Sequence, residues 1–173
     1  MAASRHVLPL VAVGWLIVAP CAPAAQAAEA LYEADFRHGR APEWELDPGW
    51  VLARQDEGRQ ALRGQGHHWA RLSQHSFGDS RLRLRLKLIR GCVHLNYRVD
   101  GPRRYFIGLS DAGLYLSKQT GPGRFQENLA SARVGLQRDR WSEVEVEGRG
   151  GAITVRIDGQ TRLRHTDDNP LAT

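Results

Sequence analysis

Residues 81–89 constrain the fold of this chain most, because leucine and a basic residue alternate along them in the order RLRLRLKLI. Successive side chains of a β-strand point to opposite faces of a sheet, so one face of this segment is apolar and the other is positively charged. A helix would place apolar residues three and four apart, and the segment lacks that spacing. The alternation therefore predicts a long strand with its leucines in a core and its basic side chains in solvent.

Shorter segments of the same kind follow along the chain, separated by turn residues. Alternating or strand-forming residues occur over 31–36, 50–53, 60–63, 69–73, 93–99, 105–109, 114–118, 141–147, 152–157 and 160–165. Dipeptides that favour tight turns, such as Asp158-Gly159, lie between them, and no helix of useful length is apparent after residue 30. Many short strands with regular turns are typical of a sandwich or barrel, so the sequence predicts an all-β fold.

The first 27 residues are typical of a secretory signal peptide. A short positive start at Arg5 precedes an apolar run over 7–19, and a small-x-small pattern ends at Ala27. The apolar run is shorter than the ~20 residues that span a bilayer. We therefore predict a signal peptide over 1–27, a domain over 28–173, and a secreted or periplasmic location with no membrane insertion after cleavage.

The mature chain keeps one cysteine, Cys92, so its fold must rest on packing without an internal disulfide. The strand-like surroundings of Cys92 predict a buried thiol. The chain stops at Thr173, soon after the strand over 160–165, and we expect the domain to be C-terminally incomplete, without its last strand or strands. The formal net charge is +5, but basic and acidic residues are interspersed, which favours solvated faces over nucleic-acid binding.

The segment from Trp141 to Gly159 resembles a hairpin of the concanavalin A-like, laminin G-like domains. It reads WSEVEVE, then Gly150, then ITVRIDG, as in the family's W-x-x-V-x-V, Gly and I-x-V-x-V-D-G pattern. The resemblance spans about residues 31–170, and within the family the chain is similar to the 3-keto-disaccharide hydrolase-like domain of bacterial secreted proteins. It implies a two-sheet antiparallel jelly-roll sandwich with a concave face that receives sugars.

A polar row within 93–99 is the principal candidate for a binding site. His94, Asn96 and Arg98 are two residues apart, so a strand would place them on one face, roughly 6 to 7 Å apart. An imidazole, an amide and a guanidinium together suit sugar hydroxyls or a sugar acid. Tyr105 and Trp69 are further candidates, because their rings can stack on sugar rings. The alternative interpretation is a solvated outer face with no ligand.

The acidic segment 143–147 resembles the Glu-x-Asp-x-Glu catalytic strand of jelly-roll glucanases, in which one carboxylate attacks and another protonates. Glu145, Glu147 and His94 are the candidates for acid–base chemistry if the protein is an enzyme. The alternative is an acidic outer face that opposes the basic residues of 81–87, since opposite charges attract across strands. Trp141, at the start of the same segment, is predicted to lie in the core.

No His-x-His or Cys-x-x-Cys spacing occurs, so no metal site and no cofactor are predicted. Asp167, Asp168 and Asn169 are a candidate for calcium, although one short acidic turn supplies few oxygen ligands. The leading hypothesis is an exported carbohydrate-binding, lectin-like module whose partner is a carbohydrate or glycan. The alternatives are a hydrolase acting on modified disaccharides or glycosides, and a non-catalytic adhesion or structural module.

Overall fold

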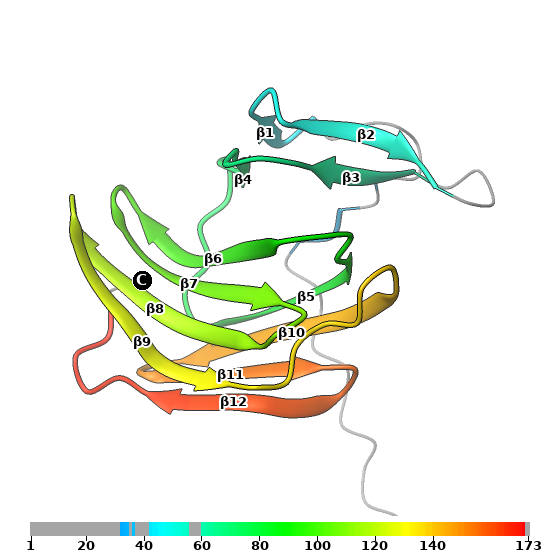
Figure 1. The fold of residues 1–173 in the computed structure, drawn as a ribbon. Helices are drawn as coiled ribbons and strands as arrows, with labels where there is room; N and C mark the ends of the chain where they lie inside the picture. The colour runs from blue at the N-terminus through cyan, green and yellow to red at the C-terminus, as the bar shows by residue number, and fades with distance from the viewer. Residues whose placement is uncertain (1–31, 35, 37–41, 56–59, 172–173) are drawn as a thin grey trace, which may run out of the picture. The chain divides into compact units, whose positions relative to one another are not determined.

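The computed structural model describes residues 32–34, 36, 42–55 and 60–171 (Figure 1). The predicted signal peptide over 1–27 lies outside them. No α-helix occurs among the described residues, and they include no helix that is long and apolar enough to cross a membrane. The described residues form two compact units, one of residues 32–34, 36, 51–55 and 60–64 and the other of residues 42–50 and 65–171.

The first unit holds most of a two-stranded sheet. Its strands are β2 (Trp50–Arg54) and β3 (Gln60–Gly64), and the first residue of β2 belongs to the second unit. The strand pair that the sequence predicts over 50–53 and 60–63 is confirmed.

The second unit holds all the other strands. A short antiparallel pair joins β1 (Trp44–Leu46) to β4 (Ala70–Leu72). Two four-stranded antiparallel sheets follow, in the orders β12-β11-β10-β5 and β6-β7-β8-β9, and Figure 1 shows them packed as two layers. Their strands are β5 (Ser80–Lys87), β6 (Cys92–Asp100), β7 (Arg103–Ser110), β8 (Leu114–Gly121), β9 (Arg124–Ala132), β10 (Trp141–Arg149), β11 (Ala152–Ile157) and β12 (Gln160–Thr166). The predicted two-sheet antiparallel sandwich is confirmed.

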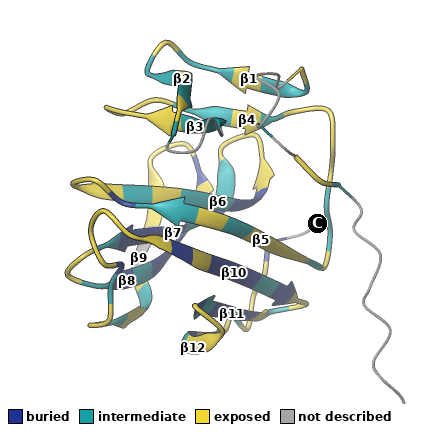
Figure 2. Cartoon of the chain, turned by 90° about the vertical axis from the view of Figure 1, so that its right-hand side faces the viewer, coloured by how far each residue is buried: buried dark blue, intermediate teal, exposed yellow. Residues whose placement is uncertain are grey.

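The core lies between these two sheets and is built mainly from alternate residues of their strands, with Leu88, Leu136 and Leu171 added from the connecting and terminal segments. Buried residues alternate with exposed ones at the start of β10 (Figure 2), and Glu145 in the middle of the strand is buried as well. The core residues are Leu88, Tyr97, Tyr105, Ile107, Leu109, Leu114, Leu116, Leu136, Val144, Val146, Ile153, Val155, Ile157, Leu163 and Leu171. The leucines of β5 face this core as predicted, with Leu84 and Leu86 packed against it, whereas Leu82 near the start of the strand stays 38% exposed.

The basic strand β5 pairs with the acidic strand β10, which confirms the predicted charge complementarity. Arg83 lies opposite Glu145, and Arg81 lies opposite Glu147. The Nη2 atom of Arg83 is 3.1 Å from a carboxylate oxygen of Glu145. Because these side chains point away from the core, they neutralise one another on the outer face of this sheet.

Two predictions of burial are wrong. Trp141 is 37% exposed, because Ser142, Val144 and Val146 fill the core and the odd-numbered residues of β10 therefore point outward. Its ring lies 5.6 Å from the cationic groups of both Arg85 and Lys87. Cys92 is exposed, not buried, because it begins β6 on the face that points away from the core.

The segment after β12 is held to the sandwich by a buried ion pair. Asp167 accepts hydrogen bonds from the Lys118 ammonium at 2.7 Å and from the Tyr105 hydroxyl at 2.6 Å. Burial and the bond to Asp167 together raise the pKa of Tyr105 to about 12. Burial by itself would raise the pKa of Asp167, but the bonds from Lys118 and Tyr105 outweigh it and lower that pKa. Asp167 therefore attaches the segment after β12 to the sandwich through Lys118 and Tyr105.

Candidate ligand-binding face

The outer face of the β6–β9 sheet brings together polar and aromatic side chains from four strands. Since Tyr105, Ile107 and Leu109 fill the core, the alternate residues of β7 point outward. The pairing of β7 with β6 and β8 then determines which side chains of those strands lie beside the outward-pointing residues of β7. The face forms rows across the strands, namely His94–Gly108–Tyr115, Asn96–Phe106–Ser117 and Arg104–Gln119.

Tyr115 lies across Gly108 and reaches His94. Its hydroxyl and the His94 Nε2 atom are hydrogen-bonded at 2.7 Å. Burial is the main cause that lowers the pKa of His94, and electrostatic interaction with His67 and Arg104 adds to it. His94 is therefore a neutral imidazole at neutral pH, able to donate or accept according to its tautomer.

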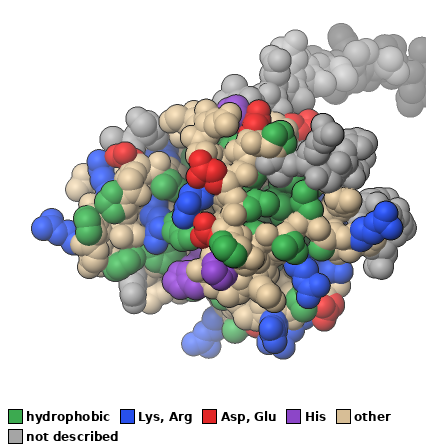
Figure 3. Space-filling model, turned by 90° about the horizontal axis from the view of Figure 1, so that it is seen from above, with side chains coloured by type: hydrophobic (Ala, Val, Ile, Leu, Met, Phe, Trp, Pro, Cys, Tyr) green, Lys and Arg blue, Asp and Glu red, His purple; other side chains and the backbone are tan. Residues whose placement is uncertain are grey.

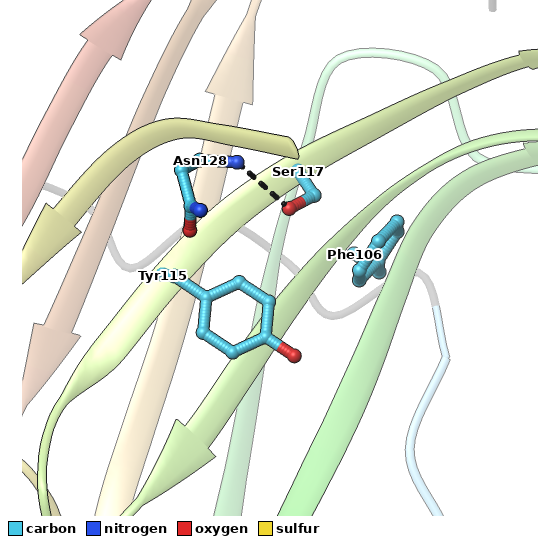
Figure 4. Close-up of a pocket in the computed structure, with 4 residues that line it drawn as sticks. All are labelled: Phe106, Tyr115, Ser117 and Asn128. Carbon is cyan, nitrogen blue, oxygen red and sulfur yellow. Dashed lines mark hydrogen bonds between the residues drawn. The ribbon is translucent and has the colours of Figure 1, made fainter. Parts of the chain in front are cut away.

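A cavity of about 270 Å³ opens in the middle of this face, lined by Phe106, Tyr115, Ser117 and Asn128 (Figure 4). Asn128 has a φ of 53°, and its N–H donates to the Ser117 Oγ at 3.2 Å. The β8–β9 register shifts at this point, between Leu116 and Lys118. The irregularity of β9 thus places an amide side chain beside the cavity.

Arg104 extends the face toward the loop before β4. Its Cζ lies 4.6 Å from the ring centroid of Trp69 and 5.8 Å from that of Phe106. Trp69 is itself positioned by Asp47, whose carboxylate accepts its backbone N–H at 2.9 Å and whose own N–H donates to the Trp69 carbonyl. Trp69 and Phe106 thus contact the guanidinium from two separate parts of the sandwich unit.

His94 and Asn96 therefore share this face, as predicted, and Trp69 reaches it through Arg104. The prediction that Arg98 belongs to the same row is wrong. A register shift between Tyr97 and Asp100 and a φ of 51° at Arg98 turn its side chain out of the row. The buried Arg98 guanidinium donates at 2.6 Å to both the Gly150 carbonyl and the Asp79 carboxylate.

Tyr105 does not belong to the face either. Its side chain is fully buried on the core side and its hydroxyl bonds to Asp167, so it does not share this face with His94 and Asn96. Phe106, Ser117, Asn128 and Arg104 also lie on or beside this face and were not predicted to belong to it. Phe106 and Arg104 are the neighbours of Tyr105 in sequence. The alternation of β7 therefore indicated two faces, but Tyr105 was assigned to the outer face, which its neighbours occupy.

The two carboxylates considered for catalysis lie on the outer face of the other sheet. Burial by itself would raise the pKa of Glu145, yet hydrogen bonds from Arg83 and Arg156 outweigh it and lower that pKa. Hydrogen bonding from Arg156 is the main cause that lowers the pKa of Glu147. Both groups are therefore ionised and paired at neutral pH. A general acid for glycoside cleavage needs a raised pKa.

Two four-stranded antiparallel sheets packed face to face define a β-sandwich, here with an aromatic and polar outer face on one sheet. A solved structure with a similar fold is the carbohydrate-binding module CBM66 from Bacillus subtilis. The likeness has a TM-score of 0.57 at 16% sequence identity, and it covers 72% of this chain and 80% of the module. No family model and no curated protein matches the sequence. At this identity, the likeness shows a shared fold.

Proposed function

We propose that this protein is an exported carbohydrate-binding module that receives its sugar on the outer face of the β6–β9 sheet. The observation that carries the proposal is the cavity in Figure 4, where the aromatic rings of Phe106 and Tyr115 lie beside the polar groups of Ser117 and Asn128. Binding sites for small ligands combine apolar and aromatic walls with a few placed polar groups. Sugars present both C–H surfaces and hydroxyls, so such a site suits them.

The neighbouring polar side chains extend this match. His94 and Asn96 lie on the same face, and each can donate or accept a hydrogen bond. The His94–Tyr115 bond orients both groups before any ligand arrives. Preorganised groups lose less conformational entropy on binding, which favours affinity. The name of the CBM66 module, a carbohydrate-binding module of similar fold, is consistent with this function.

The hydrolase alternative receives less support from the structure. Glu145 and Glu147 are ionised, ion-paired and on the opposite sheet, which leaves them poorly suited to protonate a leaving group. Membership of the 3-keto-disaccharide hydrolase-like group therefore remains a proposal. It is tested by incubating the protein with 3-keto-disaccharides and simple glycosides, and measured turnover that His94→Ala abolishes would favour it over simple binding.

The binding function is tested on a glycan array, followed by titration calorimetry with the glycan that binds best. We expect Phe106→Ala to weaken binding about tenfold or more, because it removes one wall of the cavity. Trp141→Ala is the matched control, since it removes an exposed aromatic ring from the other sheet. If the folded protein binds no glycan, or if the control loses as much affinity as Phe106→Ala, the proposed site is wrong.

Export is a separate part of the proposal and rests on residues 1–27. We expect the mature protein to begin at Ala28, because the small-x-small pattern ends at Ala27. N-terminal sequencing of the protein recovered from the periplasm or medium checks this. Recovery of the uncleaved chain in the cytoplasmic fraction would contradict it.

A further inference from the structure

We propose that the sugar bound by this face is acidic, and that Arg104 receives its carboxylate. The inference rests on the proposed carbohydrate-binding function and specifies the chemical class of the ligand. It assigns to Arg104 the recognition of a negative charge on the sugar. The other polar groups of the face are neutral at neutral pH and do not supply this recognition.

The first observation is the absence of an acidic partner for Arg104 among the described residues. Arg98, which is buried, pairs with Asp79 at 2.6 Å, and Arg156 on the outer face of the other sheet pairs with Glu147 at 2.9 Å. Arg104 forms no ion pair with any residue that the structure describes. Its buried Nε atom has no hydrogen-bond acceptor, which is also true of the Nε atoms of Arg98 and Arg162. A partly buried cation without a carboxylate is costly, and an anionic ligand would offset that cost.

The second observation concerns the electrostatic surroundings. Burial lowers the pKa of Arg104, and no neighbouring carboxylate opposes that effect. The charge of Arg104 in turn helps to lower the pKa of His94, with burial as the larger cause. An arginine side chain stays protonated even so. The face therefore carries an uncompensated positive charge beside the cavity.

The third observation concerns the N–H groups of the Arg104 guanidinium that remain available to donate hydrogen bonds. The Arg104 Cζ lies near the rings of Trp69 and Phe106, and ring contacts of this kind do not use up the N–H donors of a guanidinium. These donors match the two oxygens of a carboxylate. Phe106 lines the cavity and its ring centroid lies 5.8 Å from the Arg104 Cζ, so a ligand in the cavity would bind near this cation.

Gln119 adds an independent sign that the site is incomplete without a ligand. It lies directly across the β7–β8 ladder from Arg104 and is only 8% exposed. Its side-chain N–H donates to the Gly121 carbonyl, but its side-chain oxygen receives no hydrogen bond. A buried polar atom without a partner is uncommon and calls for an explanation. A sugar acid offers a carboxylate to Arg104 and a hydroxyl donor to Gln119.

The other basic side chains of the molecule do not indicate an acidic ligand in the way that Arg104 does. In the face drawn in Figure 3, Lys and Arg side chains are dispersed among hydrophobic and polar ones. On the outer face of the other sheet, the arginines of β5 are opposed by the glutamates of β10. General attraction of polyanions would therefore depend weakly on any single arginine, whereas the proposed site depends on Arg104.

The test compares oligogalacturonates with the same oligosaccharides after methyl esterification, which removes the charge and keeps the sugar. Binding is measured by titration calorimetry to the mature protein and to the variants Arg104→Gln, Arg104→Lys and Arg85→Gln. Arg85→Gln is the matched control, because Arg85 also lies over a tryptophan, Trp141, but on the other sheet. All variants are first checked for folding by circular dichroism.

We expect the acid to bind at least about tenfold more tightly than the ester, because a charge-assisted pair is lost on esterification. Arg104→Gln should abolish this preference and Arg85→Gln should keep it. Arg104→Lys should give an intermediate preference, since it keeps the charge but not the planar fork.

Equal affinity for acid and ester would overturn the inference and leave the carbohydrate-binding function standing. Binding of neutral sugars alone on a glycan array would have the same meaning. Failure of the folded protein to bind any glycan would overturn the proposed function and this inference with it. If Arg104→Gln does not fold, the comparison of acid with ester on the unaltered protein still decides the question.

Discussion

The ring of Tyr115 packs directly against Gly108, where a Cβ atom in place of a glycine hydrogen would lie 2.2 Å from the tyrosine Cζ. The two residues are paired across β7 and β8. The same Tyr115 hydroxyl bonds to His94 at 2.7 Å on the far side of β7. The absence of a side chain at Gly108 thus lets one aromatic ring span three strands and line the cavity.

Gly108→Ala should therefore damage the site more than the fold. The added methyl meets the far end of a side chain, so we expect Tyr115 to swing away and lose its bond to His94. Glycan affinity should fall about tenfold, whereas the free energy of unfolding should change by less than about 2 kcal/mol. Calorimetric titration and urea unfolding measure the two effects. An unchanged affinity would show that the position of Tyr115 does not matter for binding.

Asp167→Ala should destabilise the sandwich strongly. The substitution leaves the Lys118 ammonium, whose side chain is 4% exposed, without its carboxylate. Removing one partner of a buried pair costs about 3 to 5 kcal/mol. Urea unfolding at neutral pH gives the change in free energy.

The exposed pair between Arg138 and Asp111 provides a control for this prediction. Its atoms are also 2.7 Å apart, but the side chains of Arg138 and Asp111 are 56% and 39% exposed. We expect Asp111→Ala to cost less than about 1 kcal/mol, because exposed pairs are screened by water. Similar losses for Asp111→Ala and Asp167→Ala would contradict the idea that burial makes the Asp167 pair important.

Acid should destabilise the protein through its paired carboxyls. The pKa values of Glu147 and Asp167 lie below their ordinary values of 4.5 and 3.8 in the folded protein. The unfolded chain therefore binds more protons in this range, so the stabilisation is complete above the ordinary values and is lost as the pH falls below them. Melting temperatures measured from about pH 7 down to about pH 3 should show the loss in the acid part of that range.

A variant tests whether this pH dependence comes from the paired groups. Glu147→Gln removes one titrating carboxyl, so the melting temperature should depend less steeply on pH in acid than in the unaltered protein. A melting temperature that stays constant throughout the acid range would contradict the sign of the shift. An unchanged slope in Glu147→Gln would assign the effect to other carboxyls.

The fold was largely predictable because the strand signal is local. The alternation of 81–89 predicts both faces of β5, and the opposite charges of β10 predict its partner. Trp141 shows the limit of this reasoning. Its hydrophobic character suggested the core, but the alternation of β10, with Val144 and Val146 inside, places it outside. Where hydrophobic character and strand alternation disagree, the position of the residue along the strand decides whether its side chain is buried.

The site was less predictable because it depends on register and on backbone irregularities. The pairing of Phe106 with Ser117 and of Gly108 with Tyr115 is set by how β7 and β8 align, which no single strand encodes. Arg98 has the correct spacing to join His94, yet a φ of 51° removes it from the row. A positive φ is uncommon for arginine, so its sequence gives no sign of the change.

Cys92 offers a direct probe of whether the face binds a ligand. It begins β6 two residues before His94, on the same side of the strand, and its thiol is exposed. The pKa of the thiol is raised, mainly by partial burial, so the reactive thiolate is scarce at neutral pH. We expect N-ethylmaleimide to alkylate Cys92 of the folded protein slowly, at a rate that rises with pH. Mass spectrometry measures this rate.

A glycan bound beside His94 and Tyr115 should slow this alkylation, because it covers the start of β6. His94→Ala, which removes a polar contact but leaves Cys92 in place, should reduce the protection at the same glycan concentration. A glycan that binds in calorimetry yet leaves the alkylation rate of Cys92 unchanged would show that its site lies away from this end of the face. Protection that is equal in the unaltered protein and in His94→Ala would show that His94 does not contribute to binding.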